Sequence, residues 1–259
     1  MSEFHKTQRA MRTMRTTAMA RGVIALLDIG TSKVSCLVLR FENPEAANDY
    51  PTPLFQQSAM RVIGAKTIAA QGVRYGEIDA MAETERAIRT AVQAAQKMAN
   101  TRVDHVIACF AGGDPRSYGL AGEVDVAGSH VEEQDVARVL AACDMPDIGW
   151  GREVLHAHPV NFALDHRSGL SDPRGHVGAK LATDMHMLTV DAASVQNIIT
   201  CIRRCDLELA GIASSAYVAG LSALVEDEQE LGAACIDMGG GATGVSIFLK
   251  KHMIHANTV

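Results

Sequence analysis

Residues 26–33 read LLDIGTSK, and residues 235–244 read CIDMGGGATG. Each stretch begins as an apolar strand, passes through an aspartate and a tight turn of Gly and small polar residues, and continues as a second apolar strand. Because glycine has no side chain, such a turn lets successive backbone N–H groups approach anionic oxygens. Asp28 and Asp237 are placed to hold a hydrated Mg²⁺ beside those oxygens. The two stretches together predict a clamp for nucleotide phosphates.

An ordinary β-hairpin is the alternative explanation for each stretch. The first stretch, taken alone, is typical of an ordinary β-hairpin. The second has three consecutive glycines, Gly239, Gly240 and Gly241, which favour phosphate binding. Two copies of one design, about 200 residues apart in a single chain, favour the clamp over two unrelated turns.

The composition is that of a globular protein with one large domain or two modest ones. Of its 259 residues, 47% are hydrophobic and 21% are charged. No apolar run reaches the roughly 18 residues of a membrane span, and the N-terminus has no secretory signal. The six cysteines include no Cys-x-x-Cys pair, which favours reduced, cytosolic thiols. Cys201 and Cys205 lie one helical turn apart, and burial explains them better than a metal site.

Charge is distributed unevenly along the chain. Residues 1–21 carry a net charge of +4, and the remainder carries −10. The acidic body argues against nucleic acid as a partner. We expect residues 1–20 to form a disordered basic tail, although such an arm could also touch anionic lipid.

The hydrophobic periodicity predicts an α/β chain with an inserted block. After the first hairpin we expect an exposed loop at 43–53, strands at 59–63 and 67–69, and a helix at 82–100. The inserted block contains a helix at 132–143, with Ser129 as a candidate N-cap. A strand at 207–212 and a helix at 215–225 lead to an exposed acidic turn at 226–230, and the second hairpin follows.

Two histidines, His156 and His158, alternate onto one face of a predicted strand at 154–164. Such a pair could bind a metal ion. No carboxylate or cysteine is obviously placed beside them, which favours a structural role.

The order of these motifs resembles the actin-like (ribonuclease H-like) ATPase superfamily, and within it the FtsA family of bacterial cell division proteins. The residues that carry the resemblance are the two hairpins, the helix at 82–100, the stretch around His156, the segment Ala213–Ser215 and the acidic run at 226–232. The similarity covers about residues 21–259. It implies a first-half subdomain at 21–101 and 181–210, an inserted α+β subdomain at 102–180, and the start of a second-half subdomain at 211–259.

The resemblance also implies a site and partners. ATP and Mg²⁺ would be the cofactors, with Asp28 and Asp237 near the metal ion. The residues expected to line the nucleotide are Gly30, Thr31, Ser32, Lys33, Ser215, Gly239, Gly240, Gly241 and Thr243. FtsA proteins tie the tubulin-like division ring protein FtsZ to the cytoplasmic face of the inner membrane at the division site. They form filaments, and the inserted subdomain contributes contacts with other divisome proteins.

FtsA proteins run well over a hundred residues further, so the resemblance implies that this chain is truncated at its C-terminus, with an incomplete second half. The adenosine-binding turn, the main surface for the ring protein and the membrane helix would lie in the missing part. Slow ATP hydrolysis at most is expected. Two alternatives stay open: a small-molecule kinase, which shares both hairpins, and a pilus-assembly ATP-binding protein, whose fold also contains an inserted subdomain.

Overall fold

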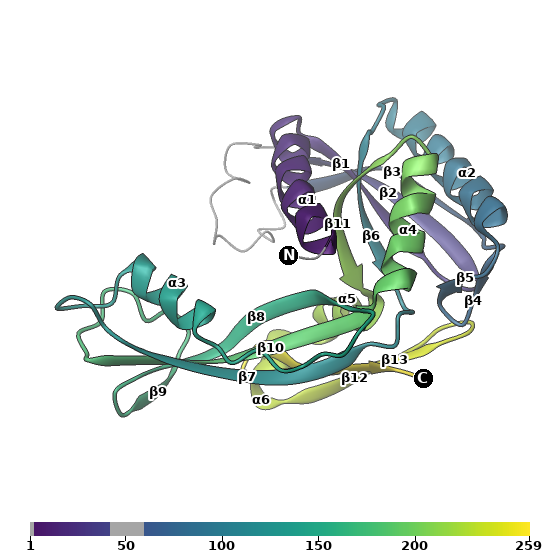
Figure 1. Ribbon diagram of the computed structural model, residues 1–259. Helices are drawn as coiled ribbons and strands as arrows, with labels where there is room; N and C mark the ends of the chain where they lie inside the picture. Colours follow the sequence, from purple (N-terminus) through teal and green to yellow (C-terminus); the bar gives the residue numbers. More distant parts are fainter. Residues whose placement is uncertain (1–2, 42–59) are drawn as a thin grey trace.

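A mixed sheet of five strands, in the order β11-β6-β1-β2-β3, forms the largest layer of the molecule (Figure 1). The computed structural model describes residues 3–41 and 60–259. β1, β2 and β3 form an antiparallel meander, whereas β6 and β11 lie on the other side of β1 and run parallel to it. The strands are β1 (Val23–Ile29), β2 (Lys33–Phe41), β3 (Met60–Ala69), β6 (His105–Phe110) and β11 (Glu208–Ser214).

Helices α2 (Met81–Ala99) and α4 (Ala192–Arg204) pack together on one side of this sheet (Figure 1). The apolar residues of α2, predicted as a helix from their spacing, are buried against β2 and β3. At Gly64 in β3 the contact is so close that a Cβ would lie 2.2 Å from the carbonyl oxygen of Ala95. Only glycine allows this approach of helix to sheet.

The opposite face of the sheet carries α1 (Glu3–Ala20), so the prediction of a disordered tail at residues 1–20 is wrong (Figure 1). Met11, Ala18 and Met19 are buried, and the helix packs against β1, β6 and β11. These positions recur at helical spacing, so the methionines form an apolar stripe while Arg12 stays exposed. The side-chain amide of Gln8 also donates to the Val154 carbonyl at 2.7 Å.

A second, antiparallel sheet in the order β7-β10-β8-β9 forms an elongated arm (Figure 1). Its elements are β7 (Arg116–Asp125), α3 (Glu133–Ala141), β8 (Arg152–Leu164), β9 (Arg167–Leu170) and β10 (Lys180–Asp191). Val139 in α3, Leu164 in β8 and Leu181 in β10 are buried in the core of this arm. It is the predicted inserted subdomain.

The strand pairing moves the predicted subdomain boundaries. β6 hydrogen-bonds with β1 and β11, so it belongs to the first sheet, whereas β10 pairs with β7 and β8 along its whole length. The inserted subdomain therefore spans 116–191 instead of 102–180. β11 also belongs to the first sheet, so the second half begins at Ser215 instead of residue 211. Long-range pairing, which local periodicity does not reveal, decides these boundaries.

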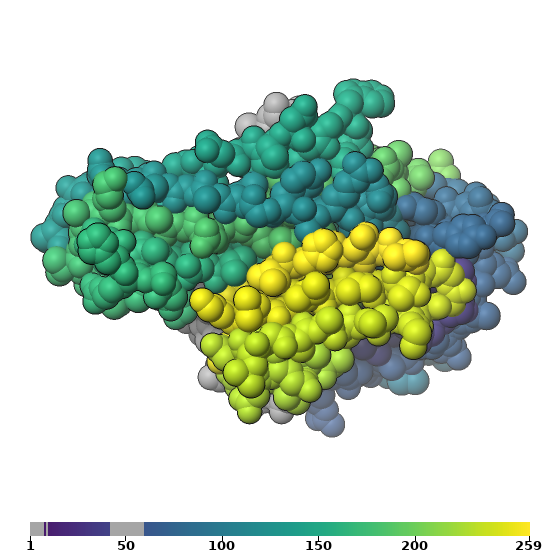
Figure 2. Space-filling view, turned by 90° about the horizontal axis from the view of Figure 1, so that it is seen from below, coloured from purple at the N-terminus to yellow at the C-terminus, as the bar shows by residue number. Residues whose placement is uncertain are grey.

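The third sheet, β12-β13-β14, lies directly beside the inserted subdomain, as Figure 2 shows in yellow and teal. β14 contacts β7, β8 and β10, and α5 packs on all three strands of the sheet. The elements are α5 (Ser215–Ala223), α6 (Glu226–Leu231), β12 (Ala233–Met238), β13 (Thr243–Leu249) and β14 (His252–Thr258). A small pair, β4 (Val73–Arg74) and β5 (Glu77–Ile78), precedes α2.

Several local predictions differ from the structure. The acidic residues 226–230 form helix α6 instead of a turn, because the Glu228 carboxylate accepts from the Val225 N–H at 2.9 Å. Helix α3 begins after Glu132, whose N–H donates to Asp135 at 2.9 Å, so Ser129 is not its cap. The two strands expected at 59–69 are one strand, β3, and the loop expected at 43–53 lies outside the described residues. No described helix combines the length and apolar character needed to cross a bilayer.

Candidate functional site

The turns of the two hairpins are closed in the same way. In the first, which joins β1 to β2, the Gly30 N–H donates to the Lys33 carbonyl at 3.0 Å. In the second, which joins β12 to β13, the Gly239 N–H donates to the Ala242 carbonyl at 2.9 Å. The aspartate stands two residues before the closing glycine in both hairpins. The two stretches are therefore one structural unit used twice.

The two turns face each other in direct contact. A Cβ built on Gly240 would lie 2.8 Å from Cβ of Ser32, and one built on Gly241 would lie 2.7 Å from Cγ2 of Thr31. Real Cβ atoms essentially never lie so close to another heavy atom, so a side chain at either position would force the facing residue of the first turn to shift. The structure thus brings together the two corners that the sequence predicts to share a ligand.

Backbone donors at these corners are available to a ligand. Within the described residues, no partner accepts from the amides of Ser32, Gly240 or Gly241. Ser32 and Gly240 are exposed, as is the Lys33 side chain. Converging amides with an adjacent lysine are the donor set that phosphate oxygens require.

Asp28 and Asp237 lie close enough for their charges to interact. Burial raises the pKa of Asp28, the charge of Lys33 lowers it, and the charge of Asp237 raises it again. Cys109 in β6 pairs with Asp28 in β1, and burial together with the Asp28 charge raises the pKa of its thiol to about 12. Two facing carboxylates destabilise one another unless a cation lies between them. Among the described residues, no group of three or more acidic, His or Cys side chains is arranged to hold a metal ion. Mg²⁺ is commonly held by only one or two carboxylates, with phosphates and water completing the shell.

A third loop supports the first turn, and sequence reasoning missed it. The Gly76 N–H, between β4 and β5, donates to Oγ1 of Thr31 at 3.1 Å. Gly76 in turn lies against Gly112, where a Cβ would be 2.5 Å from the Gly76 carbonyl. Gly76 and Gly112 were the residues in the sequence that could have indicated this contact.

The remaining predicted residues, Ser215 and Thr243, lie at the start of α5 and of β13. The Thr243 backbone exchanges hydrogen bonds of 2.7 and 2.8 Å with Val259, so it is committed to strand pairing. The first turn of α5 lies against β13, because a Cβ on Gly244 would be 3.0 Å from Cβ of Ala216. Neither predicted residue is among those that join the two turns.

The histidines of β8 have structural partners. The Ser214 N–H donates to Nε2 of His156 at 3.2 Å, and Nε2 of His158 lies 3.2 Å from the Met253 carbonyl. Both contacts fit the structural role that the sequence favours.

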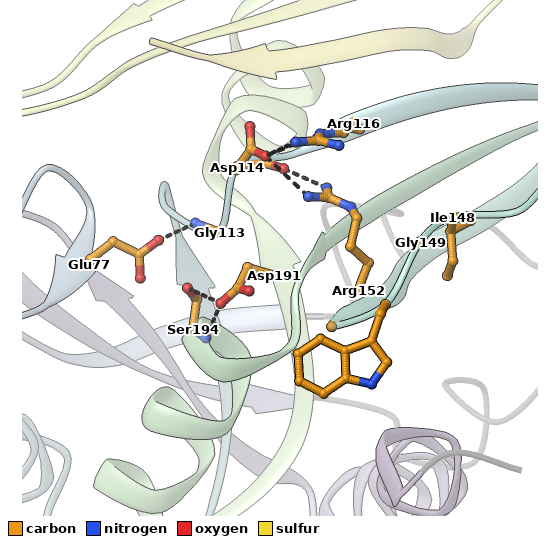
Figure 3. Close-up of a pocket in the computed structure, with 11 residues that line it drawn as sticks. Glu77, Gly113, Asp114, Arg116, Ile148, Gly149, Arg152, Asp191 and Ser194 are labelled. Carbon is orange, nitrogen blue, oxygen red and sulfur yellow. Dashed lines mark hydrogen bonds and ion pairs between the residues drawn. The ribbon is translucent and has the colours of Figure 1, made fainter.

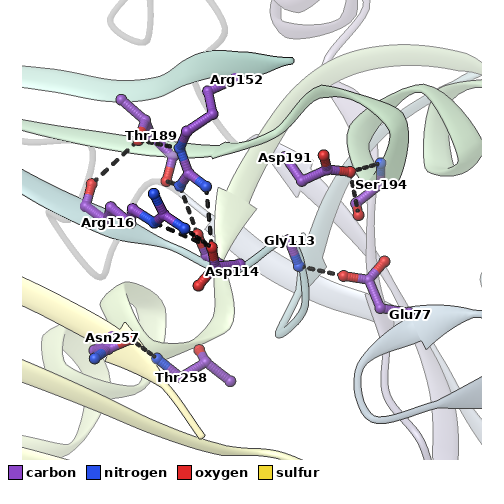
Figure 4. A network of polar contacts seen from close by, with 10 residues as sticks. All are labelled: Glu77, Gly113, Asp114, Arg116, Arg152, Thr189, Asp191, Ser194, Asn257 and Thr258. Carbon is purple, nitrogen blue, oxygen red and sulfur yellow. Dashed lines mark hydrogen bonds and ion pairs between the residues drawn. The ribbon is translucent and has the colours of Figure 1, made fainter. Parts of the chain in front are cut away.

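A separate cavity of about 470 Å³ lies where the inserted subdomain joins the first sheet, lined by residues that include Glu77, Asp114 and Asp191 (Figure 3). Arg152 and Arg116 both point to Asp114 there. Figure 4 shows the wider network, in which the Arg152 guanidinium also donates to Oγ1 and to the carbonyl of Thr189, each at 3.0 Å. This arginine therefore ties three segments together at the root of the arm.

Arg152→Ala is expected to lower the free energy of unfolding by about 2–3 kcal/mol, because a charged donor with several partners is lost from a side chain only 8% exposed. The matched control is Arg116→Ala, which removes an exposed ion pair to the same Asp114 and should cost less than about 1 kcal/mol. Urea unfolding of both variants measures the difference. Equal losses would contradict the anchoring role of Arg152.

Comparison with known proteins shows which family the chain is similar to. Residues 112–189 match the SHS2 domain inserted in FTSA, and this stretch contains β7 to β9, α3 and most of β10. Over 237 residues the chain is 35% identical to cell division protein FtsA of Rhizobium meliloti (strain 1021). Residues 112–189 are thus similar to the inserted domain of FtsA, and the chain as a whole is similar to FtsA proteins. That match covers 92% of this chain and 53% of the relative, so the chain spans about half the length of the curated relatives it matches.

More distant FtsA relatives agree over the same region. FtsA of Escherichia coli (strain K12) is 23% identical over 239 residues, covering 92% of this chain and 54% of that protein. Among solved structures, a chain of the PilM-PilN type IV pilus biogenesis complex superposes with a TM-score of 0.56 and 11% identity, covering 90% of this chain and 60% of that chain. At that identity the likeness shows the fold alone, and the predicted actin-like fold is confirmed.

Proposed function

We propose that this chain is the nucleotide-binding part of an actin-like scaffold of bacterial cell division, with MgATP bound between the two glycine turns. The observation that carries the proposal is the direct contact of Gly240 and Gly241 with Ser32 and Thr31. Two copies of one phosphate-type turn meet there, and both bring an aspartate. Similarity to FtsA supplies the link to cell division, since the relatives are cell division proteins by name.

In this proposal the amides of the two turns bind the phosphate oxygens, and Lys33 offsets their charge. Asp28 and Asp237 hold Mg²⁺, directly or through water. The turns are in van der Waals contact, so phosphates can enter only when the third sheet moves away from the first. The chain crosses between these sheets where β11 ends at Ser214 and α5 begins, which makes this junction the hinge.

The proposed partners follow from the family. They are the ring protein FtsZ, other divisome proteins that bind the inserted subdomain, and further copies of the chain in a filament at the cytoplasmic face of the inner membrane. Hydrolysis is proposed to be slow, and a nucleic acid partner is disfavoured by the net charge of −6.

Two measurements test the proposal. Calorimetric titration of the chain with ATP should show saturable binding that weakens when Mg²⁺ is removed. A full-length FtsA protein that contains this chain should co-pellet with purified FtsZ filaments, because the main surface for FtsZ is expected in the remaining part, and a preparation without FtsZ is the control. Absence of ATP binding would overturn the clamp, and rapid phosphorylation of a sugar or acid would favour a kinase instead. Binding of ATP without FtsZ retention would leave only the partner assignment refuted.

A further inference from the structure

A column of neighbouring rings lies where the inserted subdomain meets the third sheet, with one tilted pair followed by two stacked pairs. It runs from His186 in β10 through His158 in β8 and Tyr217 in α5 to Phe248 in β13. The successive ring centroids are 5.5, 5.8 and 6.1 Å apart. Figure 1 shows why these elements meet, because β8 and β10 pass over α5 and the third sheet at the root of the arm. The column therefore connects two parts of the molecule that have separate sheets.

The hydrogen bond of His156 at this junction requires a neutral imidazole, whereas that of His158 is open to both protonation states. Nε2 of His156 accepts from the Ser214 N–H at 3.2 Å, and a protonated ring has no lone pair for that bond. His158 uses Nε2 to donate to the Met253 carbonyl in β14 at 3.2 Å. Both nitrogens of His186 are buried and lack a hydrogen-bond partner within the described residues. Protonation of His186 would thus bury a charge and two unsatisfied donors.

Burial and the neighbouring histidines both lower the pKa values of the rings at this junction. Burial is the main cause that lowers the pKa of His156 and of His186 to about 4. His186 also faces His158 and His255, so any proton on a neighbour opposes a second one. His158, whose pKa is lowered by burial, faces His252.

The carboxylate that acts on these histidines is Glu230 of α6, which faces His252 at the start of β14. It raises the pKa of His252, although burial lowers that pKa more strongly. The elements packed around the column thus present histidines to His156 and His186.

We propose that this column is an acid-sensitive joint: it holds the inserted subdomain against the third sheet while its imidazoles are neutral, and it opens when they are protonated. The joint concerns the contact between two parts of the fold and does not depend on nucleotide binding. Two backbone amides report on it, Ser214 N–H and Ala256 N–H. Ser214 ends β11 in the first sheet, and its amide reports on the state of His156, whose ring centroid lies 5.2 Å from that of Tyr217 in the column. The Ala256 N–H donates to Oγ of Ser117 in β7 at 2.8 Å and so spans the junction.

The direction and the size of the pH effect on opening follow from proton linkage. In the opened state each imidazole regains a pKa near 6.5, above its value in the closed joint, so the opened state binds more protons as pH falls. Closure is fully favoured above about pH 6.5 and is lost progressively from there down to about pH 4. Between pH 7.5 and 5.5, each titrating histidine should raise the opening constant about 10-fold, and His156 with His186 about 100-fold.

Amide exchange followed by NMR on the whole chain tests the joint. Corrected for the intrinsic rate, exchange at Ser214 and Ala256 should accelerate about 100-fold between pH 7.5 and 5.5, while amides of α2 should not. His186→Phe keeps a ring in the column and removes one titrating group, so its acceleration should fall to about 10-fold. His166→Phe, at an exposed turn outside the column, is the matched control and should retain the full acceleration.

Three results would overturn the joint. The first is an unchanged pH response in His186→Phe, and the second is equal acceleration in α2, which would signify global unfolding. The third needs no variant: a direct titration of the His186 ring in the natural chain should show no protonation above pH 5. A midpoint near 6.5 would contradict the joint even if the variants failed to fold.

Discussion

Gly240→Val is expected to weaken ATP binding by about 100-fold or more, equivalent to at least about 2.7 kcal/mol, while the chain stays folded. The valine Cβ would begin 2.8 Å from Cβ of Ser32, so its branched side chain would fill the space that phosphate oxygens must enter. Ser32 is exposed and can shift, so the free energy of unfolding should change by no more than about 1 kcal/mol. Calorimetric titration with MgATP measures the binding, and urea unfolding measures the stability.

Gly119→Val is the control for this substitution. A Cβ on Gly119, within β7, meets no atom within 4 Å, so the variant should bind ATP like the natural chain. Neither Gly240 nor Gly119 has a positive φ, which means that backbone strain contributes to neither result. Retained ATP affinity in Gly240→Val would refute the assignment of the second turn.

The two turns could be predicted from the sequence because all their determinants are local. The aspartate, the glycines and the flanking apolar strands lie within about ten residues of each other in both hairpins. The helix at 82–100 was predictable for the same reason, since its spacing places Ile88, Ala91 and Ala95 on one face. A helix or strand can thus be predicted well from local sequence when the same spacing of apolar residues also forms its buried face.

Features that depend on distant partners could not be predicted in this way. Arg152 binds Asp114 and Thr189, each nearly 40 residues away in the sequence, and nothing near Arg152 indicates these contacts. Helix α1 was missed because its apolar stripe consists of Met and Ala, which also occur in unstructured tails. The loop glycine Gly76 was missed because its role exists only through its contact with Thr31.

Asp237→Ala is expected to separate the effect of Mg²⁺ from that of the phosphates. It should weaken ATP binding at least about 10-fold when Mg²⁺ is present, because one of two candidate metal ligands is lost. Without Mg²⁺ the affinity should be equal or higher, since a carboxylate that repels phosphate is gone. Titrations with and without Mg²⁺ measure both effects. A loss of equal size in the two conditions would show that Asp237 does not act through the metal ion.

The same variant should also change the stability of the chain without ligand. Asp28 has its pKa raised in the folded chain, so its contribution to stability is fully present below its ordinary pKa of 3.8 and is lost as pH rises through the raised value. Asp237 is one cause of that rise, and Asp237→Ala should therefore stabilise the Mg²⁺-free chain at pH 7. Added Mg²⁺ should raise the melting temperature of the natural chain and leave that of the variant nearly unchanged. The two carboxylates would then be retained for the metal ion, at the expense of stability without it.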